Sequence, residues 1–302
     1  MQIPDRAKLS RVVLMLAAFV FFSANTVHFI EHPDTTALAA IDPTLHFELV
    51  EVDGKKPYLN VKSAILVNYD RGEVLYAKNI DKVRPVASIT KMVMVMVLID
   101  KGVDLEVTET ILKEDARRSS RSRLRVGYEL NLRDLLYAAL LNSDNRAARA
   151  LARATSGSIE AFTSEMNAKV RALGLENTRF FEPTGLDKRN VSTAREVAKI
   201  MHYAIEYPLI AEITSTKNWR CRVINRKNTH LQMANTNLMM YSRFSVVSGK
   251  TGYIRAADYC LATVLRNSDG ERITLVVLGV PGDKLRFREA RRLAEWGFKK
   301  IA

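Results

Sequence analysis

Ser88 and Lys91 form a Ser-x-x-Lys pattern that could support nucleophilic catalysis. A serine hydroxyl is a poor nucleophile until a base takes its proton. On a helix, a spacing of three residues places the lysine side chain close to the hydroxyl. Burial and a neighbouring positive charge lower the pKa of a lysine, so its neutral amine can serve as that base. The pattern indicates serine acyl transfer, but it is short enough to occur by chance.

Two further short motifs offer groups for the same reaction. Ser143-Asp144-Asn145 lies where one expected helix ends and another begins, so a loop there can project a hydroxyl and an amide into a cleft. Lys250-Thr251-Gly252 lies inside an expected strand, where Gly252 leaves the backbone open to close approach by a ligand. Lys250 and Thr251 offer a charge and a hydroxyl to a carboxylate. Taken singly, the two motifs could be an ordinary turn and a weak edge strand.

The elements that must position these motifs are strands near both ends of the chain and helices between them. The apolar run 92–99 has no polar face, which predicts a helix buried on all sides directly after Ser88. Apolar patterns predict strands at 63–68, 73–77, 219–225, 246–254, 259–266 and 272–280. Helices are expected after an Asn131 cap, at 146–155, 159–173 and 193–207, and after Asp283. The predicted class is α+β, with one mostly antiparallel sheet and an inserted helical region.

The N-terminus indicates export. Arg6, Lys8 and Arg11 precede the apolar run 12–22, which is short for a membrane span and fits a signal peptide. Phe22 stands where cleavage would need a small side chain, so residues 1–24 are expected to be a signal peptide or a retained anchor. Residues 25–56 are predicted to be a loosely structured lead-in. The expected location is the periplasm or cell envelope.

Composition excludes several classes of protein. The formal net charge of +13 is spread in short clusters, without zinc-finger spacing or an aromatic RNA-binding motif. We therefore expect no nucleic-acid partner, and consider peripheral association with an anionic membrane or the cell wall. Cys221 and Cys260 form no C-x-x-C pair, and the five histidines are scattered, so neither a metal nor a cofactor is expected. The two cysteines could form a disulfide or remain separately buried thiols.

The three motifs, in this order, resemble those of penicillin-binding proteins and class A β-lactamases. From about residue 60 the chain resembles the low-molecular-mass penicillin-binding proteins, which are D-alanyl-D-alanine peptidases. Segments 120–124 and 181–185 look most like the DD-endopeptidase branch. The resemblance implies a β-lactamase/transpeptidase-like fold with a five-stranded, mainly antiparallel sheet flanked by helices. It implies a peptidase domain at 57–302, with an all-helical subdomain inserted at about 110–208.

The resemblance also implies a catalytic role for three residues. Ser88 would attack the carbonyl group that follows a D-alanine, with Lys91 as its base. Ser143 would relay a proton to the leaving amine, and water would then hydrolyse the acyl-enzyme. The partners would be peptidoglycan peptides as substrates and β-lactams as covalent inhibitors.

Five further residues would bind the substrate if the resemblance holds. Asn145 would hold the amide on the acyl side of the scissile bond. Lys250 and Thr251 would bind the carboxylate beyond that bond, and Lys250 would help to keep Lys91 neutral. Gly252 would admit the substrate backbone, and the N–H group of Tyr253 would form the oxyanion hole together with that of Ser88.

The expected activity is hydrolysis of D-alanyl bonds, with an endopeptidase that cleaves cross-links favoured over a carboxypeptidase that trims stem peptides. A β-lactamase is the nearest alternative, since Asp144 is the middle residue familiar from class A enzymes. However, the chain has no E-x-x-L-N loop to supply a deacylating glutamate, and Glu182 lies in a peptidase-like Pro-Thr-Gly-Leu-Asp context. A non-catalytic peptidoglycan-binding protein is the third hypothesis.

Overall fold

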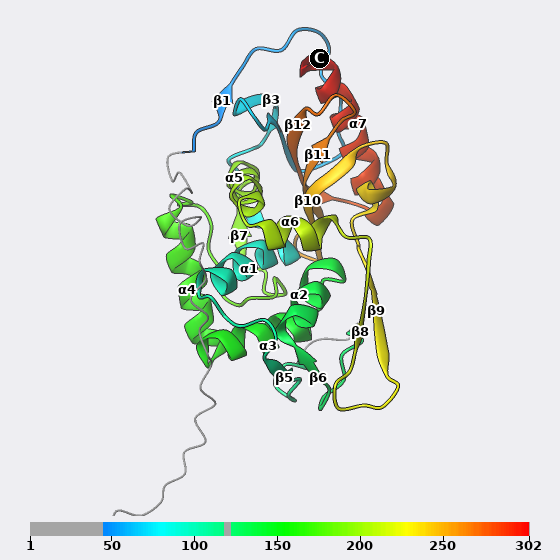
Figure 1. Cartoon of the computed structure of the whole chain (residues 1–302). Helices are drawn as coiled ribbons and strands as arrows, with labels where there is room; N and C mark the ends of the chain where they lie inside the picture. The colour runs from blue at the N-terminus through cyan, green and yellow to red at the C-terminus, as the bar shows by residue number, and fades with distance from the viewer. Residues whose placement is uncertain (1–44, 118–121, 302) are drawn as a thin grey trace, which may run out of the picture.

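A computed structural model describes residues 45–117 and 122–301 of the chain (Figure 1). Within these residues the central sheet has six strands in the order β1-β3-β2-β12-β11-β10. Five of them pair in antiparallel fashion, namely β2 (Ser63–Asn68), β3 (Glu73–Lys78), β10 (Ser245–Ile254), β11 (Asp258–Arg266) and β12 (Arg272–Val280). The sixth, β1 (Glu48–Leu49), pairs in parallel with β3. The predicted α+β class and five antiparallel strands are confirmed, and β1 adds a strand too short to show periodicity.

The sheet is covered on both faces, so every residue of its central strand β2 is buried. Side chains alternate between two hydrophobic clusters along β2, with Ile65 in one and Leu66 in the other. Helix α7 (Asp283–Ile301) packs on the face that carries Leu66. Figure 1 shows this helix beside β11 and β12. A Cβ atom at Gly297 would lie 2.2 Å from Leu66 Cδ2, so a glycine is needed for this close helix–sheet contact.

Helices α1 (Thr90–Asp100) and α5 (Ala194–Ile205) belong to the cluster on the other face. All residues of α1 from Thr90 to Leu98 are buried, as the absence of a polar face predicted. The inserted region contains α2 (Leu132–Leu141), α3 (Asn145–Ser156) and α4 (Ile159–Ala172). It also contains a short antiparallel strand pair, β5 (Thr108–Thr110) and β6 (Glu129–Asn131). Asn131 caps α2 by accepting a hydrogen bond from the Asp134 N–H, as expected. Helix α6 (Pro208–Ser215) begins at a proline directly after the helix predicted at 193–207, and it was not predicted.

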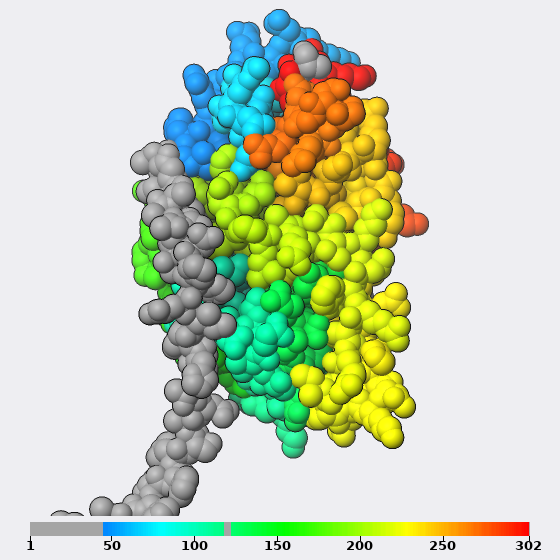
Figure 2. Space-filling model, in the orientation of Figure 1, coloured from blue at the N-terminus to red at the C-terminus, as the bar shows by residue number. Residues whose placement is uncertain are grey.

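The strand predicted at 219–225 does not join the central sheet. It forms a separate hairpin from β8 (Asn218–Arg222) and β9 (His230–Ala234). The hairpin lies along the inserted region, where Trp219 stacks on Tyr137 of α2 with ring centroids 3.7 Å apart. Figure 2 shows this yellow hairpin beside the green helices. Strand β9 was missed because its apolar residues, Leu231 and Met233, are too few to reveal an alternation.

Cys221 lies in β8 and Cys260 in β11, and both are buried free thiols. Burial raises the pKa of Cys221 to about 12 and that of Cys260 to about 11. The sequence left open a disulfide or separately buried thiols, and the structure has the separate thiols. No helix among the described residues is long and apolar enough for a membrane span. The segment 1–24 and most of the lead-in lie outside the described residues.

Candidate active site

Ser88 lies in a short 3-10 turn, η2 (Ala87–Ile89), that leads directly into α1. Ala87 has a φ of +50°, a left-handed conformation that is unusual for a residue with a side chain. Two glycines pack against this turn. A Cβ atom at Gly185 would lie 2.1 Å from the Ala87 carbonyl oxygen, and one at Gly252 would lie 3.1 Å from Ser88 N. The turn that presents Ser88 is therefore clamped between β10 and the segment 182–187, which we call the Glu182 loop.

Lys91 lies one turn of helix after Ser88 and is completely buried. Its Nζ atom is 3.1 Å from Ser88 Oγ, 2.7 Å from Asn145 Oδ1 and 2.6 Å from the Thr184 carbonyl oxygen. A neutral amine has two protons and one lone pair. When Asn145 Oδ1 and the Thr184 carbonyl oxygen accept hydrogen bonds from these two N–H groups, the lone pair is left to face the Ser88 hydroxyl. This is the arrangement that a general base requires.

Burial lowers the pKa of Lys91 to about 7. The charges of Glu182 and Asp144 act in the opposite direction and raise this pKa, whereas Arg149 lowers it further. A large fraction of Lys91 is therefore neutral near pH 7, where an ordinary lysine would be charged.

The Ser143-Asp144-Asn145 motif forms the junction between α2 and α3. Asp144 is buried and is the N-cap of α3, since its Oδ1 accepts hydrogen bonds from the N–H groups of Arg146 and Ala147. Ser143, with a φ of +57°, precedes the cap. The cap thus holds the two flanking side chains in different directions, with Asn145 on Lys91 and Ser143 on Lys250. The middle residue of the motif is structural in this arrangement.

Lys250 is the second buried lysine of the site. Its Nζ donates to Ser143 Oγ at 2.9 Å and to the Thr251 carbonyl oxygen at 3.0 Å. Burial and the nearby charges of Lys91 and Arg286 lower the pKa of Lys250. Repulsion between two buried ammonium groups is mutual, so the protonation of Lys250 also favours the neutral form of Lys91.

Strand β10 is the last strand at its edge of the sheet, and its inner side pairs with β11. Thr251 is buried and its hydroxyl lies 2.6 Å from that of Thr236. Tyr253, which is 49% exposed, directs its ring toward Tyr259, with stacked centroids 4.2 Å apart. Within the part of the chain that the structure describes, the outer edge of β10 pairs with no other strand of this sheet, so an extended peptide could add there.

The structure thus brings the predicted residues together around Ser88, in two linked groups. Lys91 and Asn145 contact each other beside Ser88. Ser143 contacts Lys250, the first residue of the Lys-Thr-Gly motif in β10. Sequence reasoning missed Thr184, whose contribution is a backbone carbonyl group. It also missed Arg286, whose buried guanidinium donates to the Gly252 carbonyl oxygen at 3.2 Å.

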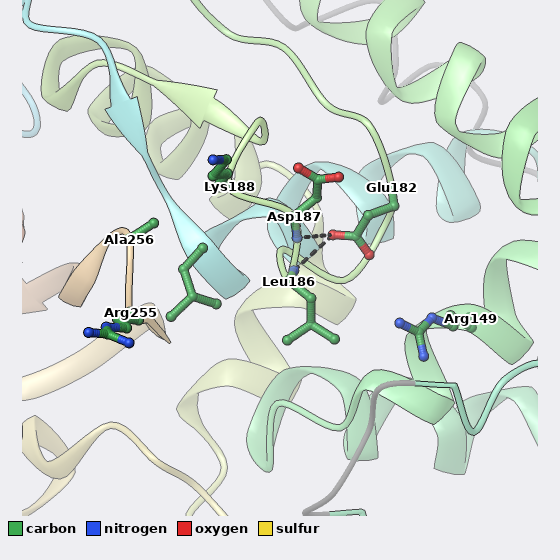
Figure 3. A pocket seen from close by; sticks show the side chains of 8 residues that line it. Arg149, Glu182, Leu186, Asp187, Lys188, Arg255 and Ala256 are labelled. Carbon is green, nitrogen blue, oxygen red and sulfur yellow. Dashed lines mark hydrogen bonds between the residues drawn. The ribbon is translucent and has the colours of Figure 1, made fainter.

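A cavity of about 410 Å³ opens beside the Glu182 loop (Figure 3). Glu182 and Leu186 of the Glu182 loop line one side, and Ile254 and Arg255 at the end of β10 line another. Arg149 of α3 and Lys188, which follows the Glu182 loop, line it as well, so with Arg255 the cavity has basic groups from three segments. Among the described residues, no group of three or more His, Cys, Asp or Glu side chains could hold a metal ion.

Comparison with known proteins places the chain in a family. The profile of the D-alanyl-D-alanine carboxypeptidase family matches residues 51–282. The chain is 37% identical over 246 residues to the D-alanyl-D-alanine endopeptidase of Escherichia coli K12, covering 80% of this chain and 78% of that protein. It is 38% identical over 238 residues to the D-alanyl-D-alanine endopeptidase of Pseudomonas aeruginosa PAO1, covering 78% and 76%. The Streptomyces K15 DD-transpeptidase structure is similar, with a TM-score of 0.76, 27% identity, and coverage of 82% and 100%.

The fold, the site and these matches define the class: this is a serine DD-peptidase, a hydrolase with the penicillin-binding fold. The chain belongs to the D-alanyl-D-alanine carboxypeptidase family, whose profile covers most of its length. The resemblance inferred from the three motifs is confirmed, and the β-lactamase and non-catalytic hypotheses are not supported.

Proposed function

We propose that this chain is a D-alanyl-D-alanine endopeptidase that uses Ser88 as its nucleophile and Lys91 as its base. The observation that supports these roles is the set of hydrogen bonds that Lys91 Nζ makes. Two acceptors other than Ser88 take its two N–H groups, which leaves its lone pair for the Ser88 hydroxyl. Attack of Ser88 Oγ on the carbonyl carbon transfers the hydroxyl proton to Lys91 Nζ. The developing oxyanion is stabilised by the backbone N–H groups of Ser88 and Tyr253.

Collapse of the tetrahedral intermediate breaks the C–N bond and releases the amine. Ser143 supplies the proton that this amine needs and is reprotonated from Lys250, with which it shares a hydrogen bond. After the amine has left, the proton that Lys91 took from Ser88 is returned to Lys250, so both lysines regain their starting states. Water then attacks the ester, Lys91 takes one proton from this water, and it passes that proton to Ser88 Oγ as the ester bond breaks. The result is one hydrolysed peptide bond and an unchanged enzyme.

Substrate binding follows from the groups that remain available. Asn145 uses its carbonyl oxygen on Lys91, which leaves the amide NH₂ for the substrate carbonyl on the acyl side. Thr251 and Lys250 bind the carboxylate beyond the scissile bond. That carboxylate favours the protonated form of Lys250, which in turn favours neutral Lys91. The stem peptide runs along the outer edge of β10, past Gly252, toward the cavity in Figure 3.

We expect acylation by a β-lactam to slow as the pH falls through 7. Only neutral Lys91 can take the Ser88 proton, and its pKa is about 7. The second-order acylation rate should therefore be at a plateau above about pH 8 and fall about tenfold for each pH unit well below 7. Intact-mass measurement of the penicilloyl adduct across this range tests the prediction. A rate independent of pH from 5 to 8 would contradict the assignment of Lys91 as the base.

The choice of endopeptidase rests on the two relatives named above, which carry that name and match over three quarters of their length. The alternative is a carboxypeptidase, because the matching family profile carries that description. The two reactions share the acyl donor and differ in the leaving group. An endopeptidase releases the cross-linked diamino acid of a second peptide, and a carboxypeptidase releases free D-alanine.

Digestion of purified cross-linked muropeptides distinguishes the two activities. We expect dimers to be converted to monomers by the wild type and by a Ser215→Ala control on the exposed end of α6. Release of terminal D-alanine from pentapeptides, with dimers left intact, would instead establish a carboxypeptidase. The reaction products are separated and identified by mass.

We further propose that the enzyme works in the periplasm, where its peptidoglycan substrate lies. The N-terminal segment with signal-peptide features and the net charge of +13 support export and a loose association with anionic membrane or wall surfaces. Such an association depends on charge, so it should be lost at high ionic strength.

A further inference from the structure

Glu182 is one of two acidic residues that line the cavity, with Asp187, and its carboxylate is turned back into its own loop (Figure 3). Its Oε1 accepts hydrogen bonds from the N–H groups of Gly185 at 2.6 Å and Leu186 at 2.8 Å, and a longer one from Asp187 at 3.3 Å. Its Oε2 accepts from both the N–H and the hydroxyl of Thr184. One carboxylate thus satisfies the backbone donors of four consecutive residues.

The loop that Glu182 holds contacts both reacting groups of the active site. The Thr184 carbonyl oxygen accepts a hydrogen bond from Lys91 Nζ at 2.6 Å and lies 3.3 Å from Ser88 Oγ. Gly185, with a φ of +85°, packs against the Ala87–Ser88 peptide with no room for a side chain. The shape of this loop therefore determines where the lone pair of Lys91 points and how the Ser88 turn is supported.

We propose that Glu182 is a positioning residue for the Ser88–Lys91 pair, acting through the Thr184 carbonyl group and the Gly185 backbone. This assignment rests on the proposed roles of Ser88 and Lys91. An ionised carboxylate suits the task, because its two acceptor oxygens can receive all the converging donors at once. A neutral amide would retain one acceptor and turn an NH₂ group toward some of these donors.

Glu182 also contributes its charge to the site. Its negative charge raises the pKa of Lys91, against the larger effect of burial. Position and charge can be separated by two substitutions. Glu182→Gln keeps the length of the side chain and removes the charge, whereas Glu182→Asp keeps the charge and withdraws the carboxylate by one methylene group.

The test is the second-order rate of Ser88 acylation by benzylpenicillin, followed by intact mass from below to above pH 7. We expect Glu182→Gln to lower the plateau about 10- to 100-fold, since small displacements of reacting groups have effects of this size. We also expect the acid limb of its pH profile, the range below the plateau in which the rate falls, to move to lower pH. The reason is that removal of the negative charge lowers the pKa of Lys91. Glu182→Asp should lose a similar part of the plateau, with the limb near its wild-type position. Glu176→Gln, an exposed residue preceding the same region, should behave as wild type in both respects.

Melting temperatures of all four proteins show whether a lost rate reflects unfolding. A purely structural role would reduce the fraction of active enzyme in step with stability and would leave the acid limb in place, and that result would overturn the assignment. A wild-type plateau and limb in Glu182→Gln would overturn it too. If the wild type itself formed no Ser88 adduct, the proposed function would fail and this assignment with it, an outcome distinct from failure of the Glu182 variants alone.

Discussion

Ser88→Ala is expected to abolish the penicilloyl adduct and to lower the rate of muropeptide cleavage at least ~10⁴-fold. The hydroxyl is the group that forms the covalent bond, and alanine provides no nucleophile in its place. Asn145 and Lys250 would still bind substrate, and the backbone N–H groups of residue 88 and Tyr253 would still polarise its carbonyl. A small residual rate from water attack is therefore compatible with the mechanism.

The fold should tolerate this substitution. Among the described residues, Ser88 Oγ has two hydrogen-bond contacts, a long one with the Thr184 carbonyl oxygen and one with Lys91 Nζ, so alanine removes little packing. The melting temperature should stay close to that of the wild type, and a Ser215→Ala control should keep both stability and activity. An adduct of penicilloyl mass on the Ser88→Ala protein would show that another residue is the nucleophile and would end the proposed mechanism.

The parts of the site that sequence reasoning recovered are side chains in short motifs at distinctive positions. Ser88 and Lys91 were recognisable because a helix without a polar face follows Ser88 and two further motifs follow in order, and the structure buries that helix from Thr90 to Leu98. Asn131 was recognisable as a cap because capping uses a local side-chain pattern. These signals lie in short stretches of sequence, so they can be recognised without knowledge of the tertiary packing.

The parts that were missed depend on tertiary packing. Thr184 acts through a carbonyl group, which every residue has, so its type does not reveal the contact with Lys91. Arg286 lies in the first turn of α7, where the apolar stripe of the helix gave no reason to single out a basic residue. Glu182 was noted for its surrounding motif, but its hydrogen bonds to four residues of its own loop appear only when the loop is folded.

The short elements show the same limit. The two residues of β1 and the five of β9 are paired by partners distant in sequence or across a long turn. Segments of this length have no measurable period. The strand predicted at 219–225 was assigned to the central sheet, because apolar content alone does not tell which partner a strand will pair with.

Lys91→Met is expected to lower the acylation rate about 10²- to 10⁴-fold, the usual contribution of a general base. Methionine has a similar volume and fills the buried space, but it has no lone pair on nitrogen. The acid limb near pH 7 should disappear together with the group that produces it. Lys101→Met, at the other end of α1 where the lysine pairs with Glu165 at 2.7 Å, should keep the wild-type rate and limb.

Some loss of stability should accompany Lys91→Met, because Asn145 Oδ1 and the Thr184 carbonyl oxygen lose their donor. Lys91→Arg separates this effect from the chemistry. A guanidinium retains N–H donors for both oxygens, but it stays protonated at neutral pH and has no lone pair to offer. If Lys91 is the base, arginine should be nearly as inactive as methionine. If arginine restored the acylation rate, the positive charge of Lys91 rather than its basicity would be what Ser88 requires.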